Sequence, residues 1–280
     1  GVPGVKSNNM KIIQDHNLTH ENYYNDTDYV SNSMLSHLTN KSPEYFQYML
    51  NHSQPPSSAM KFGSAFHMYV LQPDEFEKHY VVTPNIDKRT KQGKQEYAEF
   101  MLKNQFKTLI SESDLQTIQM MSDKLSQDSL CKDLLKIGKP EQIIAWNNPE
   151  YDVNCKGMLD IHCNINDIIV DLKTTQDCNL KPFTRSIKKY MYHKQAAFYT
   201  DAVRALSYYI VAIEKNPPFS LNVFEISGDV LDQGRDLYNQ ELYLYKRCLD
   251  EDNWPGPSMA IWKDVQDREP IDINNFEDIL

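Results

Sequence analysis

The residues best suited to chemistry are two aspartates and a lysine near the middle of the chain. Asp171, Leu172 and Lys173 lie in an apolar run typical of a β-strand, and Asp171 and Lys173 would share one face because strand side chains alternate. The polar residues 164–167 predict a turn, and a hairpin centred there places Asp160 directly opposite Asp171. Residues paired in this way have Cβ atoms about 5 Å apart, so the two carboxylates repel each other and we expect a cation to compensate them. Oxygen ligands favour Mg²⁺, with Mn²⁺ as a substitute.

The spacing alone leaves a second interpretation open. A solvated strand face that carries an Asp–Lys ion pair is common in proteins, and a shift of one residue in the turn would separate the two aspartates. If the metal interpretation holds, Lys173 would hold or activate a water molecule, or stabilise the charge that develops on a phosphate.

Further short patterns accompany this pair. Residues 157–160 followed by 171–173 have the form G-x-x-D … D-x-K, residues 63–67 read G-x-x-x-H, and residues 195–199 read Q-x-x-x-Y. In the last two patterns the end residues are four apart and would share a helix face. The set, in this order, resembles the RecB-like branch of the PD-(D/E)xK nuclease superfamily.

Within that branch the chain resembles the nuclease domain of the RecE (exonuclease VIII) family, from about Tyr24 to Ile226. The segments that carry this likeness are Tyr29–Ser33, Ser42-Pro43, Phe62–His67 and Asp87–Lys94. The resemblance implies an α/β fold (an α+β mixed sheet) in which a central sheet is flanked by helices and preceded by an N-terminal helical region. It also implies a metal-dependent exodeoxyribonuclease that degrades linear double-stranded DNA in the 5′→3′ direction.

The same resemblance implies partners and an assembly. The enzyme, from a prophage, would leave 3′ single-stranded overhangs for recombination by a single-strand annealing protein of the RecT kind. The chain would form a ring-shaped homotetramer that encloses DNA. Its net charge of −10, from 29 basic and 39 acidic residues, argues against a non-specific DNA coat. A ring would reconcile this charge with DNA processing, because only the channel needs to be basic.

The resemblance also assigns roles to single residues. The implied metal ligands are one imidazole, two carboxylates and one backbone carbonyl, those of His67, Asp160, Asp171 and Leu172. Lys173 would position the nucleophile, and Gln195 and Tyr199 would contact the scissile region or Lys173. Glu141, where a strand begins, is a further candidate ligand, although a surface carboxylate explains it nearly as well. Without the resemblance, His67 would more often be structural, and Gln195 and Tyr199 would be ordinary packing residues.

Two basic segments are candidates for contact with DNA phosphates. The first, Asp87–Lys94, carries Lys88, Arg89, Lys91 and Lys94, and the second carries Arg185, Lys188, Lys189 and Lys194. Such runs of charge are usually solvated surface, but they stand out in an acidic chain. We also expect Gly63 to let its helix approach another element closely.

The expected organisation has three parts. Residues 1–23 are a polar segment, in part an expression remnant, 24–250 are one nuclease domain, and 251–280 are an acidic tail. Within the nuclease domain, 24–136 form the helical part and 137–250 the catalytic core. Periodicity predicts helices over 33–50 (interrupted near Pro43), 59–71, 95–136, 186–206 and 229–249, with a loop over 83–94. It predicts strands over 141–146, 153–163, 168–174, 208–213 and 221–226.

Composition argues against several other classes. The five cysteines are odd in number and form no C-x-x-C pair, which argues against disulfides, zinc and an iron–sulfur cluster and fits a cytoplasmic protein. No apolar run approaches the roughly 20 residues that span a bilayer.

Two alternatives to an exonuclease remain. One is an endonuclease or flap nuclease on the same core, and the other is a non-catalytic DNA-binding protein. The intact Asp160, Asp171 and Lys173 argue against the last.

Overall fold

The predicted strands assemble into one mixed sheet with the predicted hairpin at its centre. The computed structural model describes residues 10–14, 16–52 and 54–257, and within them the sheet runs in the order β1-β5-β6-β7-β8-β9, with β2 beside β6. The strands of this sheet are β1 Lys11–Ile12, β2 Val30–Ser31, β5 Lys139–Asn148, β6 Val153–Cys163, β7 Ile168–Thr175, β8 Ser207–Glu214 and β9 Leu221–Ile226. Neighbours along this order are antiparallel except for the parallel pair β7–β8.

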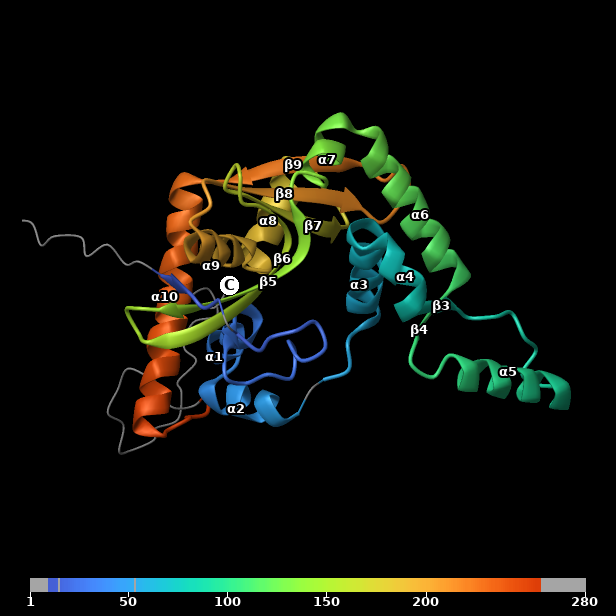
Figure 1. Ribbon diagram of the computed structural model, residues 1–280, viewed down its shortest axis with the longest axis horizontal. Helices are drawn as coiled ribbons and strands as arrows, with labels where there is room; N and C mark the ends of the chain where they lie inside the picture. Colours follow the sequence, from blue (N-terminus) through green and yellow to red (C-terminus); the bar gives the residue numbers. More distant parts are fainter. Residues whose placement is uncertain (1–9, 15, 53, 258–280) are drawn as a thin grey trace, which may run out of the picture.

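Helices cover both faces of the sheet (Figure 1). They are α1 Asn32–Asn40, α2 Pro43–Asn51, α3 Ser58–Leu71, α4 Pro73–His79, α5 Lys91–Lys103, α6 Glu112–Gln127, α7 Ser129–Leu134, α8 Leu180–Lys189, α9 Tyr192–Val203 and α10 Gly228–Glu251. One apolar core, which includes Phe183 and Phe198, joins α1, α2, α8, α9 and α10 to the sheet. A second core, which includes Phe66 and Ile118, joins α3, α4, α6 and α7 to the sheet. The predicted fold class, a mixed sheet flanked by helices, is therefore confirmed.

The strand register agrees with the prediction from the turn. In β6 and β7, Ile161 pairs with Val170 and Cys163 pairs with Ile168. A one-residue slip would have turned every side chain of β7 to the opposite face, so this register sets which residues face α9. The five strands predicted from periodicity all occur; those over 153–163 and 221–226 have the predicted bounds, and the other three extend one or two residues further.

The helix predicted over 95–136 is wrong as a continuous element. The segment contains most of α5, all of α6 and α7, and the strand β4 Thr108–Ile110, which pairs in parallel with β3 Tyr80–Val82. The side chain of Ser111 accepts a hydrogen bond from the backbone N–H of Asp114, and Asp128 accepts one from Cys131. These two N-caps satisfy amide groups that a helix start leaves unpaired, and each begins a new helix.

The helix predicted over 186–206 is also wrong, because two helices meet there. α8 already begins at Leu180, and Met191 between α8 and α9 has a left-handed backbone with φ 54° and ψ 39°. The spacing of apolar residues does not reveal this break, because one left-handed residue changes the direction of the helix axis without changing which residues of the sequence are apolar.

Two other expectations for segments also need correction. Residues Lys11–Ile12, for which no strand was predicted, form a strand that pairs antiparallel with β5. The loop predicted over 83–94 ends at Thr90, whose side chain accepts from the backbone N–H of Gly93 and caps α5. α5 extends away from the rest of the molecule (Figure 1), and among its residues only Gly93 is buried.

The remaining expectations concern the tail, the thiols and the membrane. Of the predicted acidic tail, residues 258–280 lie outside the described part of the chain. All five cysteines are buried free thiols. Within the described ranges, no helix is both long enough and apolar enough to cross a bilayer.

Candidate active site

Asp160 lies where the β-ladder opens on both of its sides. The last β6–β7 pair is Ile161 with Val170, so the two backbones separate before Asp160 meets Asp171. On the other side, the β5–β6 pairing includes neither Asp160 nor Glu141. The backbone of Glu141 has a positive φ of 49°, which is unusual for a residue other than glycine. Such conformations cost free energy and persist where the surrounding structure imposes them, often at functional sites. The central hairpin therefore presents Asp160 and Glu141 at an opening in the sheet.

The Asp160 carboxylate replaces the missing ladder bond. Its Oδ2 atom accepts a hydrogen bond of 2.7 Å from the backbone N–H of Leu172 and lies 3.5 Å from Nδ1 of His67. The predicted register is correct, but Asp160 contacts the backbone of the opposite strand and not the Asp171 carboxylate. This contact fixes one carboxylate oxygen at the start of the opening.

Three potential ligands from three elements converge at this opening. Each of three residues offers one ligand atom, and these atoms lie within 4.8 Å of one another; the residues are His67 on α3, Glu141 on β5 and Asp160 on β6. All three residues are partly exposed. Two carboxylates and one imidazole suit a divalent cation; the oxygens favour Mg²⁺, and the imidazole is better tolerated by Mn²⁺. The structure thus groups Glu141, the weakest of the predicted ligands, with His67 and Asp160.

Asp171 lies beside this group and is held by other partners. Its Oδ1 atom accepts 2.9 Å from Nε2 of Gln195, and its Oδ2 atom lies 2.6 Å from Nζ of Lys173. Apart from that ion pair, buried Oδ2 has no hydrogen-bond partner in the described part of the chain. The Lys173 ammonium is therefore the partner that compensates this buried oxygen. The two carboxylates and one imidazole of Glu141, Asp160 and His67 fit a bound cation as its ligands.

The electrostatics of the site are those of crowded carboxylates. Burial raises the pKa of Asp171, with Asp160 adding to the effect, while Lys173 opposes it. Burial also works to raise the pKa of Asp160, but His67, Lys173 and the Leu172 N–H together outweigh it, and the net pKa is lowered. Burial and Asp160 raise the pKa of Glu141 to about 7. Because a cation binds the ionised carboxylates, metal binding here would release protons near neutral pH.

Two sequence patterns fit together in the packing. Gln195 and Tyr199 share one face of α9, where Gln195 binds Asp171 and Tyr199 is buried against Gly157. A Cβ atom added to Gly157 would lie 2.6 Å from Cε1 of Tyr199, closer than real Cβ contacts. Buried Tyr208 on β8, which the sequence analysis missed, makes a side-chain hydrogen bond to Asp171. Nothing in an apolar run such as 208–213 marks which residue faces a site.

We expect Gly157→Ala to destabilise the protein, because the new methyl group overlaps the Tyr199 ring. Overpacking of this kind costs about 1–3 kcal/mol, measurable as a lower urea midpoint, and it should also move Tyr199 away from the site. Gly63→Ala is the matched control. The expectation that Gly63 permits close packing is wrong, since an added Cβ would meet nothing within 4 Å. Gly63→Ala should therefore hold or raise stability by up to about 1 kcal/mol, and equal losses in both variants would contradict the assignment.

The second basic segment divides into an exposed part and a buried residue. Arg185, Lys188 and Lys189 are exposed on α8. Lys194, the last base of this segment, is not accessible to DNA, because its side chain is fully buried and Nζ lies 2.6 Å from Oε2 of Glu241 on α10. The exposed charges remain candidates for contact with DNA.

The first basic segment, Asp87–Lys94, leads into α5 and forms its first turn. Nε of Arg89 lies 2.9 Å from Oδ1 of Asp87, and its Nη2 lies 3.2 Å from Oδ2, so the guanidinium is already engaged. Nζ of Lys88 lies 3.4 Å from the centre of the Tyr97 ring. Lys91 and Lys94 are exposed in the first turn of α5, where the helix dipole disfavours cations. The exposed pair with Asp87 is worth little in water, so a phosphate could displace it.

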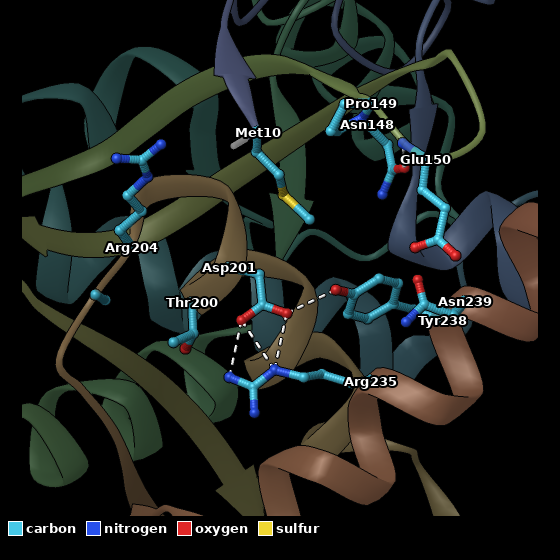
Figure 2. A pocket seen from close by; sticks show the side chains of 11 residues that line it. Met10, Asn148, Pro149, Glu150, Thr200, Asp201, Arg204, Arg235, Tyr238 and Asn239 are labelled. Atoms are coloured by element: carbon cyan, nitrogen blue, oxygen red, sulfur yellow. Dashed lines mark hydrogen bonds and ion pairs between the residues drawn. The ribbon is translucent and has the colours of Figure 1, made fainter. Parts of the chain in front are cut away.

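A cavity of about 470 Å³ lies elsewhere, between the end of α9 and α10 (Figure 2). Its lining contains none of the residues His67, Glu141 and Asp160. Nε and Nη2 of Arg235 donate to Asp201, and the Tyr238 hydroxyl donates 2.6 Å to Oδ2 of Asp201. This network ties α9 to α10, so we assign it a structural role.

Comparison with known proteins agrees with the geometry. A crystal structure from Eubacterium rectale, described as a "putative exonuclease", is similar with a TM-score of 0.62 and 16% sequence identity. The match covers 92% of this chain and 97% of that chain, and at this identity it shows the fold alone. No curated protein matches the sequence. The model of the family described as "PDDEXK-like domain of unknown function (DUF3799)" matches residues 31–261, most of the chain, and the protein therefore belongs to this PDDEXK-like family.

Proposed function

We propose that this protein is a divalent-metal-dependent exodeoxyribonuclease that degrades linear double-stranded DNA. The observation that carries the proposal is the convergence of His67, Glu141 and Asp160 at the opening of the central hairpin, beside the Asp171–Lys173 pair. Membership of the PDDEXK-like family supports a nuclease. The description of the similar Eubacterium rectale protein supports an exonuclease, as does the resemblance of the sequence to RecE.

The chemistry of the side chains follows from their charges. A cation bound by the three ligands would act as a Lewis acid toward a phosphate oxygen. Burial works to lower the pKa of Lys173, but Asp171 and Asp160 outweigh it and the net pKa is raised, so the ammonium keeps its protons. A protonated lysine has only donors; it cannot take a proton from water, and it suits the negative charge that develops on the phosphate. Gln195 orients Asp171, and Tyr199 supports the hairpin at Gly157.

The finer proposal includes direction and partners. Digestion would run 5′→3′ and leave 3′ single-stranded overhangs for a single-strand annealing protein of the RecT kind. A ring-shaped homotetramer would enclose the DNA, with the exposed bases of α8 and of the α5 segment toward it. This arrangement is supported by the resemblance to RecE and by the local basic charge on an acidic chain.

A comparison of DNA topologies tests the proposal. Purified protein should degrade linear duplex DNA with Mg²⁺ and not with EDTA, and it should leave covalently closed circles intact. DNA labelled at either the 5′ or the 3′ ends should release the 5′ label first as mononucleotides or short products. Cleavage of closed circles would instead identify an endonuclease, and no metal-dependent cleavage of any DNA would refute the proposed activity.

We expect Lys173→Met to lose turnover while it keeps metal binding. Removing one donor that stabilises charge in a transition state typically costs about 100- to 1,000-fold in kcat. The rise in melting temperature on adding Mg²⁺ should persist, because lysine is not a ligand. The measurements are kcat on linear DNA and thermal denaturation with and without Mg²⁺. A variant that loses the Mg²⁺-induced shift but turns over normally when saturated with metal would reverse this role.

A further inference from the structure

The break between α8 and α9 creates a contact that a continuous helix could not make. Tyr190 and Tyr192 flank Met191, and on a regular helix residues two apart point roughly 200° away from each other. The left-handed backbone of Met191 brings the two rings together instead, with centroids 5.6 Å apart and an interplanar angle of 28°. Such a conformation is costly for a residue other than glycine. This strain lies at Met191, where the helix predicted over 186–206 is interrupted.

This tyrosine pair leads directly to the catalytic candidates. Nζ of Lys173 lies 5.1 Å from the centre of the Tyr192 ring, and the same ammonium lies 2.6 Å from Asp171. The inner ring, Tyr192, is partly buried and lies 6.3 Å from the ring of fully buried Phe183. The outer ring, Tyr190, is 57% exposed. An aromatic surface therefore extends from Lys173 to solvent.

The surroundings of the outer ring carry positive charge. Nζ of Lys189 lies 5.2 Å from the centre of the Tyr190 ring, and Arg185 and Lys188 are exposed on the same short helix. α8 contains no acidic residue. An exposed aromatic ring with a lysine on its face, at the end of a basic helix and near a site for phosphate chemistry, matches the requirements of a nucleotide, whose base stacks while its phosphates pair with cations.

We propose that Tyr190, supported by Tyr192, stacks on a nucleobase at the end of the DNA, next to the phosphate that is cleaved. The inference rests on the proposed nuclease function and specifies how a DNA end is recognised. Bases inside a duplex cover each other's faces, so only a terminal or unpaired base has a free face for Tyr190. Base–aromatic stacking exceeds an exposed cation–π contact in strength, so a base would displace Lys189 and release its ammonium for a phosphate. The preference of the enzyme for DNA ends would then come from stacking on the Tyr190 ring.

A binding experiment separates this inference from the catalytic proposal. Oligonucleotides carry 2-aminopurine at the terminal or at an internal position, and binding is measured in EDTA, where the proposed cleavage does not occur. Wild type should quench the terminal probe, and Tyr190→Ala should not. The affinity of Tyr190→Ala for DNA ends should fall about 5- to 100-fold, the range for one lost stacking contact. Tyr190→Phe keeps the ring and should behave like wild type, as should Tyr48→Ala, which removes an exposed tyrosine that stacks on His52.

A kinetic cycle tests the contact during turnover. Linear DNA with an abasic nucleotide at successive positions from the end is compared with intact DNA, for wild type and for each variant. At one position wild type should lose about 5- to 100-fold in kcat/KM without the base, and Tyr190→Ala should show no further loss there, because the interaction is already absent. An unchanged base preference in Tyr190→Ala, or equal quenching by both proteins, overturns the inference. Quenching that depends on Tyr190 in a protein that never cleaves DNA would refute the nuclease proposal alone.

Discussion

Asp160→Asn should abolish metal-dependent cleavage while the protein stays folded. Asparagine keeps an oxygen that can accept from the Leu172 N–H, so the contact that closes the hairpin survives. The substitution removes the negative charge of one of the two carboxylates in the group formed by His67, Glu141 and Asp160. A bound cation contributes several kcal/mol of charge stabilisation, so we expect a loss of roughly 1,000-fold or more in kcat/KM on linear DNA.

The same variant tests metal binding directly. A ligand that binds only the native state raises its stability, so Mg²⁺ should raise the melting temperature of wild type and leave that of Asp160→Asn nearly unchanged. Asp123→Asn, which neutralises an exposed carboxylate on α6, serves as the control and should match wild type in both measurements. Near-normal cleavage by Asp160→Asn with a retained Mg²⁺ shift would refute the assigned site.

Lys194→Ala should be among the most destabilising substitutions in the chain. Nζ of Lys194 donates 2.6 Å to both Oε2 of Glu241 and Oγ of Ser36, and Thr39 donates 2.7 Å to the other Glu241 oxygen. The two charged side chains are 0% and 2% exposed. Truncation leaves a buried carboxylate without its counter-ion, which costs about 3–5 kcal/mol. Urea unfolding should show this loss directly.

Two comparisons isolate the cause. Lys246→Ala breaks an exposed pair with Asp250 that has the same N–O distance of 2.6 Å, and it should cost at most about 0.5 kcal/mol. The double variant Lys194→Met with Glu241→Met removes both charges and should recover much of the stability lost by Lys194→Ala. If Lys194→Ala and Lys246→Ala lose equal stability, burial is not what makes the Lys194 pair important.

Much of the framework could be predicted from local patterns. Alternating and continuous apolar runs located β5 to β9, and the turn after Cys163 set the β6–β7 register. The register then determined that Asp171 and Lys173 face α9, where Gln195 binds Asp171. These features depend on residues close together in the sequence, or on side-chain alternation that propagates along a strand. The structure brings His67, Glu141 and Asp160 together and places Asp171 against Lys173 and Gln195, while the roles of these residues remain predictions.

Contacts between distant segments decided the rest. Separation of the strands before Asp160 turned its carboxylate to the Leu172 N–H, and the φ of 49° at Glu141 placed that residue with His67. Lys194 and its basic neighbours look alike in sequence, yet α10 covers only Lys194. Periodicity cannot report which face of an element a distant helix will bury. It also cannot report a single left-handed residue such as Met191, because that residue is held in place by packing on both sides of it. Tertiary packing therefore chose which acids, lysines and tyrosines meet in one place.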